Sequence, residues 1–129
     1  MRCIGSEHYC DKQYFGKVNV AFSSPPYFTL EQYSNDETQA AYNKDYGYFI
    51  NTWWRKTVNN IDQMLSDDGL FIININDMVN GLYVGQDMIN VIREKGYQLA
   101  DVYKIKLSKN LRFIHSNEHK YEPIYIFKK

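Results

Sequence analysis

The stretch Lys17-Val18-Asn19-Val20-Ala21-Phe22-Ser23-Ser24-Pro25-Pro26-Tyr27 decides how the rest of this chain is interpreted. Its first half is short, apolar and β-prone, as in a strand, and the serine pair and the two prolines end it. A proline has no N–H to donate to a neighbouring strand, so a sheet ladder cannot continue past Pro25. We therefore expect a strand over residues 17–22 that runs into a stiff loop.

The segments that follow alternate between helix and strand. From Asp45 to Leu65, apolar residues recur at intervals of three and four, which predicts an amphipathic helix of about five turns. Asp67-Asp68-Gly69 is expected to end this helix, because a glycine suits a left-handed stop. The remaining expected elements are a long loop over residues 28–43, a strand over 70–75, a helix over 86–95 closed by Gly96, and strands over 97–107 and 121–127.

The order strand, helix, strand, helix, strand, strand predicts an α/β fold. We expect a partial Rossmann-like arrangement, in which a parallel sheet carries helices on its faces. The last two strands have no helix between them, so they are expected to form an antiparallel pair at the C-terminal edge. Ligands of such sheets bind beyond the carboxyl ends of the strands, which is where the Ser23–Tyr27 loop is expected.

Size and composition indicate one domain over residues 1–129 of the chain. Hydrophobic residues make up 44% and charged residues 23%, which matches ordinary globular proteins. The sequence has no apolar run near the ~18 residues that span a bilayer, and its start lacks the apolar stretch of a secretory signal. Two cysteines are too few for a disulfide framework, so we expect a cytoplasmic protein.

The charges cancel over the whole chain but are unevenly distributed. Residues 1–103 contain 8 Lys/Arg and 13 Asp/Glu, whereas residues 104–129 contain 7 and 2. This basic C-terminal segment either attracts a polyanion or is simply a solvated strand. The chain also has 12 tyrosines, whose flat rings suit core packing or stacking on nucleic-acid bases.

Ser24-Pro25-Pro26-Tyr27, placed directly after an apolar strand, resembles the catalytic motif of the amino-group (cytosine-N4 or adenine-N6) DNA methyltransferases. That family reads Asp/Asn/Ser-Pro-Pro-Tyr/Phe at the end of a sheet strand. The similarity continues through Ser34, the Trp-bearing helix, the Asp68-Gly69 turn and the closing Ile-Tyr-Ile-Phe-Lys-Lys strand, so it covers residues 16–129.

The resemblance implies S-adenosylmethionine-dependent methyl transfer to the exocyclic amino group of a flipped DNA base. Serine at the first motif position is more typical of the cytosine-N4 branch than of the adenine-N6 branch. RNA or a glutamine side chain of a protein are alternative substrates, because related motifs act on planar amide or amino nitrogens. A further alternative is an inactive module that binds DNA or a partner.

The residue types of the motif suit this chemistry. An exocyclic amine is a poor nucleophile because its lone pair is conjugated into the ring. The Ser24 side-chain oxygen and the Pro25 carbonyl can accept its two hydrogens, and Pro26 helps to fix the loop, so that the acceptors are preorganised. Tyr27 would stack on a base swung out of the duplex. The resemblance assigns the same roles, while the structural alternative is an ordinary turn with a packed tyrosine.

Other candidate residues lie outside the motif. No metal is expected, because the spacing of Cys3, His8 and Cys10 is not a usual ligand pattern. Three polar residues end the second strand at the same sheet edge and either line the base or cofactor cleft or cap that edge: Asn74, Asn76 and Asp77. Basic residues of the C-terminal segment are expected to contact phosphates without reading sequence. The candidate substrate-binding residues are Phe28, Asn74, Lys104, Lys106, Lys109 and Arg112.

The main cofactor motif of the family is missing from the sequence. The resemblance implies a Gly-rich turn after the first strand of the sheet, but the segment Gly81–Gly85 matches that turn poorly. Only Ser23 and Ser24 are candidates for cofactor binding, and the sequence signal for them is weak. The chain therefore looks like the catalytic half of a class I methyltransferase. Its expected partners are DNA and either the missing N-terminal cofactor-binding half or a partner subunit.

Overall fold

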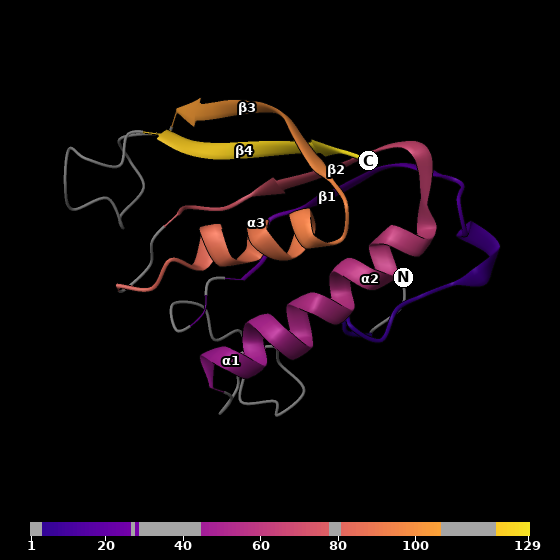
Figure 1. The fold of residues 1–129 in the computed structure, drawn as a ribbon, viewed down its shortest axis with the longest axis horizontal. Coiled ribbons are helices and arrows are strands. Elements are labelled where there is room, and N and C mark those ends of the chain that lie inside the picture. The colour runs from indigo at the N-terminus through magenta and orange to yellow at the C-terminus, as the bar shows by residue number, and fades with distance from the viewer. Residues whose placement is uncertain (1–3, 27, 29–44, 78–80, 107–120) are drawn as a thin grey trace.

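The chain forms one mixed sheet with its helices packed on one side (Figure 1). The computed structural model describes residues 4–26, 28, 45–77, 81–106 and 121–129. The strands are β1 (Val18–Ser23), β2 (Leu65–Asn74), β3 (Gln98–Lys106) and β4 (Tyr121–Lys128), in the spatial order β1-β2-β4-β3.

The strand pairing confirms the expected fold class. β1 and β2 are parallel, and β4 lies antiparallel to both β2 and β3. It follows that β1, β2 and β3 all run in the same direction and that their carboxyl ends lie at one edge of the sheet, which we call the carboxyl edge. The antiparallel pair of final strands is present as expected, with β3 outermost.

The long helix is built from three consecutive parts: α1 (Tyr46–Tyr48), a π-helical segment η2 (Phe49–Trp54) and α2 (Arg55–Met64). The Asp45 side chain caps it by accepting a hydrogen bond of 2.6 Å from the Tyr48 N–H. A π-helix fits more residues into each turn than an α-helix and is rare. Here four of its six residues are buried: Phe49, Ile50, Trp53 and Trp54.

The helix ends earlier than the sequence predicts, and Gly69 has a different role. Leu65 is already extended, and β2 begins there and pairs with Val18. Gly69 does not have a positive φ, so it is not the left-handed stop that was expected. A Cβ on Gly69 would instead lie 2.9 Å from the Ser66 carbonyl oxygen and 3.1 Å from the Val18 carbonyl oxygen. This glycine allows β1 and the start of β2 to approach each other closely.

One other helix agrees well with the sequence-based expectations. Helix α3 (Val84–Glu94) is followed by Gly96 with φ of 106°, the predicted left-handed residue. A short 3₁₀ turn, η1 (Lys12–Tyr14), precedes β1. No helix of the described part of the chain is both long and apolar enough to cross a membrane.

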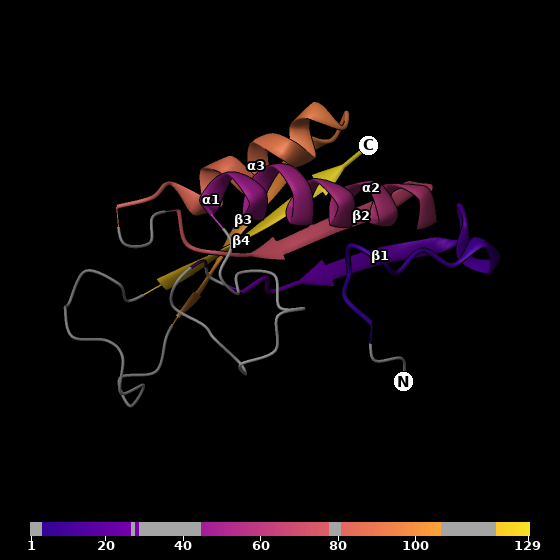
Figure 2. The same cartoon turned by 90° about the horizontal axis from the view of Figure 1, so that it is seen from below.

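The hydrophobic core lies between one face of the sheet and the helices (Figure 2). Phe71 and Ile73 of β2 and Phe127 of β4 point toward the helices and are fully buried. Trp54 packs against Phe71 and donates its indole N–H to the Met88 carbonyl of α3 at 3.0 Å. The tryptophan pair is therefore part of the core.

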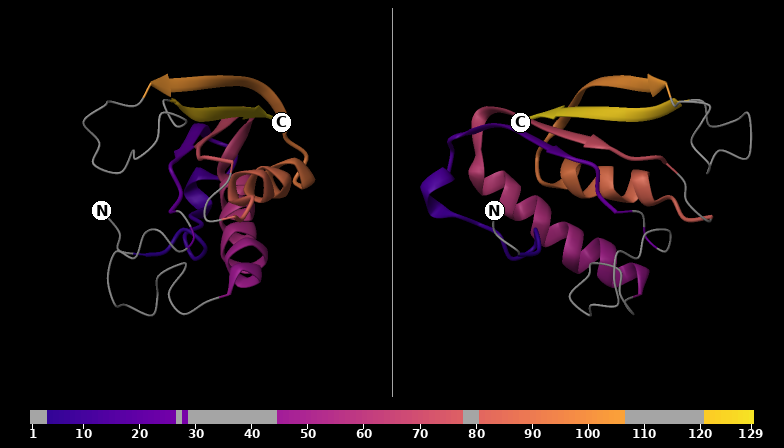
Figure 3. Two further views of the ribbon diagram at one scale, coloured as in Figure 1. Left: turned by 90° about the vertical axis from the view of Figure 1, so that its left-hand side faces the viewer. Right: turned by 180° about the vertical axis from the view of Figure 1, so that it is seen from behind.

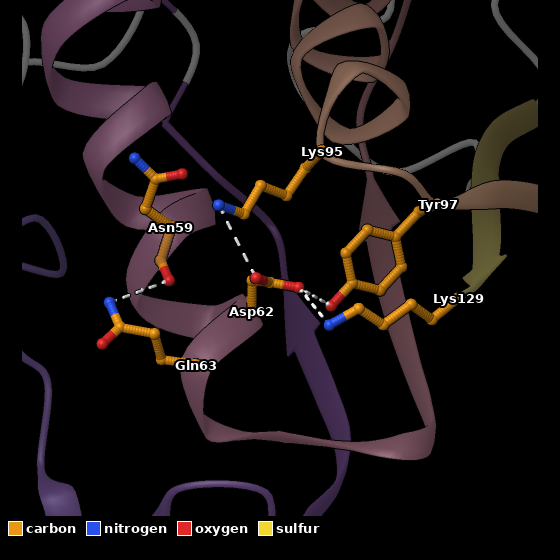
Figure 4. Close-up of polar contacts among 6 residues, drawn as sticks. All are labelled: Asn59, Asp62, Gln63, Lys95, Tyr97 and Lys129. Atoms are coloured by element: carbon orange, nitrogen blue, oxygen red, sulfur yellow. Dashed lines mark hydrogen bonds and ion pairs between the residues drawn. The ribbon is translucent and has the colours of Figure 1, made fainter.

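The opposite end of the sheet from the carboxyl edge is held by Asp62 of α2 (Figure 4). Its carboxylate accepts a hydrogen bond from the Tyr97 hydroxyl at 2.9 Å and lies 2.7 Å from the Lys129 ammonium and 3.6 Å from that of Lys95. Burial opposes ionisation of Asp62, but the hydrogen bonds from Lys129 and Tyr97 outweigh it, so its pKa lies below the ordinary value. This cluster joins the ends of α2, α3 and β4.

Candidate functional site

The carboxyl edge brings the motif and the end of β2 together. Ser23 pairs with Ile73 in the parallel register, so Ser24 and Asn74 are the next residues on the two strands. The Ser24 side chain is exposed at this edge, whereas Asn74 is buried, with 8% of its surface accessible. The expectation that Ser24 and Asn74 lie at the same edge is confirmed.

Asn74 connects Ser24 to β4 through two hydrogen bonds. Its amide Nδ2 donates to the Pro123 carbonyl oxygen at 3.0 Å, and its Oδ1 accepts a long bond of 3.5 Å from the Ser24 hydroxyl. A carbonyl oxygen only accepts, so the bond to Pro123 fixes which end of the amide faces Ser24. When the Ser24 hydroxyl donates to Asn74, its oxygen lone pairs stay available to accept hydrogen bonds from another group.

The motif loop is anchored on its other side by the core. Pro25 is buried and Pro26 is half-buried. The Phe28 ring is 9% exposed and packs against Tyr46 and Phe49, with both pairs of ring centroids 5.3 Å apart. Phe28 therefore serves as an anchor for the loop. Its expected contact with substrate stays a prediction, and its burial in the core argues against it.

A second polar pair lies at the carboxyl edge, on the helix side of the sheet. The Tyr125 hydroxyl donates to the Asp77 carboxylate at 2.5 Å, and Asp77 follows the end of β2. Burial and this hydrogen bond raise the pKa of Tyr125, so the phenol keeps its proton at neutral pH. The Asp77 carbonyl also accepts from the Gly85 N–H at 3.2 Å, which fixes the start of α3 beside the site.

Sequence reasoning missed Pro123 and Tyr125, because both depend on the pairing of β2 with β4 across about fifty residues of chain. The one usable signal was Asn74 itself, a polar residue inside the apolar run Phe71-Ile72-Ile73-Asn74-Ile75. A buried amide needs hydrogen-bond partners, so its position indicated a partner on a neighbouring strand.

The other predicted site residues are distributed as follows. Lys104 and Lys106 are exposed near the end of β3, which places them at the carboxyl edge, two strands away from β2. Ser23 is the last residue of β1 and is half-buried. Tyr27, Lys109 and Arg112 lie outside the described residues.

The described residues do not form a cofactor site of the kind that the motif implies. Three glycines have positive φ, namely Gly16, Gly81 and Gly96, and none of them joins the end of a strand directly to the start of a helix at the carboxyl edge. The described part of the chain also contains no cluster of three side chains that could hold a metal ion.

A groove of about 300 Å³ lies elsewhere, between α1–η2 and α3. The Tyr46 hydroxyl donates to Asp87 at 2.6 Å, and burial together with this bond raises the Tyr46 pKa. An Arg55–Glu94 pair of 2.7 Å bridges the same helices. None of the predicted site residues lines this groove, so we interpret these contacts as bonds between helices.

Comparison with known proteins agrees with this geometry. Residues 18–129 match the model of the N6/N4 DNA methylase family. A candidate DNA modification methylase of Thermus thermophilus, solved with S-adenosyl-L-methionine, is similar with a TM-score of 0.64 and 17% identity, over 98% of this chain and 54% of that one. A search of curated proteins finds no match.

A second similar structure is PvuII DNA methyltransferase (cytosine-N4-specific), with a TM-score of 0.57 and 18% identity, over 95% of this chain and 45% of that one. At such low identity, the similarity establishes the fold. This chain spans about half the length of the solved structures that it matches.

Proposed function

Because this chain belongs to the N6/N4 DNA methylase family, we propose that it provides the catalytic loop for methyl transfer from S-adenosylmethionine to the exocyclic amino group of a DNA base. Cytosine N4 is favoured over adenine N6, because the motif begins with serine and one similar structure is cytosine-N4-specific. The observation that carries the proposal is the exposed Ser24 at the carboxyl edge, hydrogen-bonded to a buried asparagine.

The residues of this chain act on the amine. The Ser24 oxygen and the Pro25 carbonyl accept one N–H each, which makes the nitrogen pyramidal and takes its lone pair out of conjugation with the ring. Both acceptors sit on a loop fixed by two prolines and by the buried Phe28, so little reorganisation is needed at the moment of reaction. Acceptors held in place in this way lower the barrier by avoiding the cost of orienting them during the reaction.

Asn74 has a supporting role in this proposal. By accepting the only proton of the Ser24 hydroxyl, it leaves that oxygen as an acceptor for the amine. The resemblance gives Tyr27 the role of stacking on a base extruded from the duplex. Lys104 and Lys106 are suited to contact DNA phosphates from the end of β3.

Methyl transfer is tested in the assembled enzyme, by which we mean this chain together with the part that binds the methyl donor. The assay uses a labelled methyl donor and duplex DNA, followed by digestion and mass spectrometry of the nucleosides. N4-methylcytosine is expected, whereas N6-methyladenine would correct the base, and label found only in RNA or in protein glutamine would correct the substrate class. Ser24→Ala is expected to slow the reaction by a factor of about 100 or more. Unchanged turnover would refute the role of Ser24.

Ser66→Ala is a matched control for Ser24→Ala. The Ser66 hydroxyl is buried without a hydrogen-bond partner among the described residues. It lies at the start of β2, whereas Asn74, the partner of Ser24, lies at the end of the same strand. Its removal is expected to leave methyl transfer unchanged.

A second candidate is an inactive methyltransferase-like module that binds DNA or a partner. The lack of a built cofactor site among the described residues favours it. Calorimetric titration of S-adenosylmethionine into the assembled protein separates the two, because only the enzyme needs to bind the methyl donor. A cytoplasmic location stays a prediction.

A further inference from the structure

Tyr46, the first residue of α1, contacts the motif loop through its ring. Phe28 follows the motif directly, and its ring centroid lies 5.3 Å from those of both Tyr46 and Phe49. The Tyr46 and Phe49 rings in turn stack with their centroids 6.5 Å apart and 18° between their planes. Each ring adjoins the other two, so the end of the motif loop rests on the first residues of the long helix.

The hydroxyl of the same tyrosine is bound to α3. It donates a hydrogen bond of 2.6 Å to the Asp87 carboxylate, and both side chains are half-buried. A hydrogen bond to a carboxylate is stronger than one between neutral groups. Tyr46 therefore links two parts of the molecule, because its ring packs on the motif loop while its hydroxyl is held by α3.

Asp87 is a firm attachment point, because the first turn of α3 is held on several sides. The next residue, Met88, is fully buried, and its carbonyl accepts the hydrogen bond from the Trp54 indole. The Gly85 N–H donates to the Asp77 carbonyl, which ties this turn to the loop after β2. The position of Asp87 is therefore set by the core and by the carboxyl edge.

The start of the long helix needs such an attachment. The first N–H groups of a helix have no partner within it, so the first turn opens more easily than the middle. Tyr46 lies in this turn, and its neighbours Asp45, Gly47 and Tyr48 are exposed. The bond to Asp87 therefore holds the helix at the point where Phe28 rests on it.

The topology explains why these groups meet. The long helix follows β1 and α3 follows β2, so both helices begin near the carboxyl ends of their strands and run back along the sheet (Figure 3). Their first turns consequently lie at the same end of the molecule as the motif. A bond between those two turns can therefore act on the motif loop, whereas a bond between their far ends cannot.

We propose that Tyr46 and Asp87 are positioning residues for methyl transfer. Their hydrogen bond fixes the Tyr46 ring against Phe28, and Phe28 holds the loop that carries Ser24 and Pro25. Neither residue touches the amine, and both act through the position of the loop. The inference rests on the proposed function for the reaction, but the contacts that carry it belong to this chain alone.

A purely structural bond between helices is the alternative. Arg55 of α2 and Glu94 of α3 form such a bond at 2.7 Å, with both side chains largely in solvent. Tyr46 differs from this pair by its second contact, the ring of Phe28. The proposal therefore predicts a loss of activity at Tyr46 that loss of a structural bond elsewhere does not cause.

The kinetic test uses variants of the assembled enzyme. Tyr46→Phe keeps the ring against Phe28 but removes the bond, and Asp87→Ala removes the same bond from the other side. Each is expected to lower kcat about tenfold, because displaced acceptors no longer meet the amine. KM for DNA should stay within about twofold, since the lysines assigned to the phosphates are unchanged. Asp87→Asn keeps an oxygen that accepts from Tyr46 and should retain nearly full kcat.

A second measurement follows the loop without any methyl transfer. With para-fluorophenylalanine in place of Phe28, the assembled protein has a single fluorine NMR resonance. In the Tyr46→Phe and Asp87→Ala backgrounds, this resonance is expected to move toward its position in the unfolded protein, because the ring leaves its contacts with the helix. In the Asp87→Asn background it should stay in place.

Tyr97→Phe is the matched control. It removes another tyrosine–aspartate bond, the one of 2.9 Å to Asp62, at the end of the sheet away from the motif. It is expected to lower the Tm but to leave kcat and the Phe28 resonance unchanged. If Tyr46→Phe lowered only the Tm, its bond would be structural and the proposal wrong. The proposal would also be wrong if Tyr97→Phe lowered kcat as much as Tyr46→Phe.

Failure of the proposed function gives a different result. If the unchanged assembled protein binds S-adenosylmethionine but methylates no nucleic acid or protein, the proposed function fails. A fluorine resonance that moves in Tyr46→Phe and not in Tyr97→Phe would still show that Tyr46 positions the loop. A resonance that stays in place in Tyr46→Phe would overturn the positioning role, whatever the activity of the protein.

Discussion

At the scale of single residues, Asn74 is the residue whose role the structure changes most. The sequence suggested either a substrate contact or a cap of the sheet edge. Its two hydrogen bonds, to Ser24 and to the Pro123 carbonyl, make it a positioning residue for the motif serine. Its side chain is buried, so in the proposed mechanism it acts on the substrate through Ser24 rather than directly.

We predict that Asn74→Leu lowers kcat of the assembled enzyme by roughly tenfold, with little change of KM for DNA, because the Ser24 hydroxyl loses its acceptor. Asn74→Asp keeps an oxygen for Ser24 but places a carboxylate against the Pro123 carbonyl, so it is expected to be less stable and more active than Asn74→Leu. Steady-state kinetics and thermal unfolding measure these opposite changes.

A double-mutant cycle provides the control for Asn74. Adding Asn74→Leu to the Ser24→Ala protein should cause no further loss of kcat, because the two residues act as one unit. Equal losses of kcat in both backgrounds would show that Asn74 does not act through Ser24.

At the scale of elements, the order and type of the helices and strands were predictable because apolar periodicity is a local property. The start of β2 and the role of Gly69 were not, because Gly69 is required by the approach of a distant strand carrying Val18. The π-helical segment η2 was also not predictable: its wide turn depends on packing four neighbouring apolar residues against the sheet and α3.

We predict that Gly85→Ala destabilises the carboxyl edge. A Cβ at Gly85 would fall on the backbone of Asn76 and Asp77, so the loop after β2 would have to shift. Overpacking of this kind costs about 1–3 kcal/mol. Chemical denaturation measures the loss, and Asn90→Ala, an exposed change on the same helix, is expected to stay within about 0.5 kcal/mol of the unchanged protein. A Gly85→Ala protein of normal stability would contradict the close approach of Gly85 to the backbone of Asn76 and Asp77.

We predict that the Asp62 cluster makes stability depend on acid pH. Its pKa is lowered on folding, so its carboxylate stabilises the fold above the ordinary value of 3.8, and this contribution is lost as pH falls through the lower, folded pKa. Asp62→Asn should therefore cost roughly 1 kcal/mol or less at pH 7, a value kept low because its lysine partners are more than a third exposed.

Unfolding free energies of the Asp62→Asn and unchanged proteins, measured from pH 7 down to pH 3, should converge at the acid end. Asp68→Asn removes the same charge from an exposed position and is expected to change little at any pH. A constant difference between the Asp62→Asn and unchanged proteins down to pH 3 would show that Asp62 does not titrate with a lowered pKa.

At the scale of the whole molecule, the chain separates its functions along the sheet. The core and the helices occupy one face of the sheet, and the motif, Asn74 and two lysines gather at the carboxyl edge. Composition could predict that the C-terminal segment is basic, but the place of Lys104 and Lys106 at this edge follows from β3 running parallel to β1 and β2.

This arrangement predicts which lysines contact DNA. For the assembled protein, the logarithm of the DNA association constant should fall linearly with the logarithm of salt concentration, with a slope of about −0.9 for each phosphate neutralised. Lys104→Ala and Lys106→Ala should each reduce this slope by about one and weaken binding to all sequences alike. Lys128→Ala is the matched control, because Lys128 is exposed at the other end of β4, where it pairs with Gln98. If Lys128→Ala changed the slope as much as Lys104→Ala, the DNA would have to lie across the whole sheet. That result would contradict the prediction that DNA binds at the carboxyl edge.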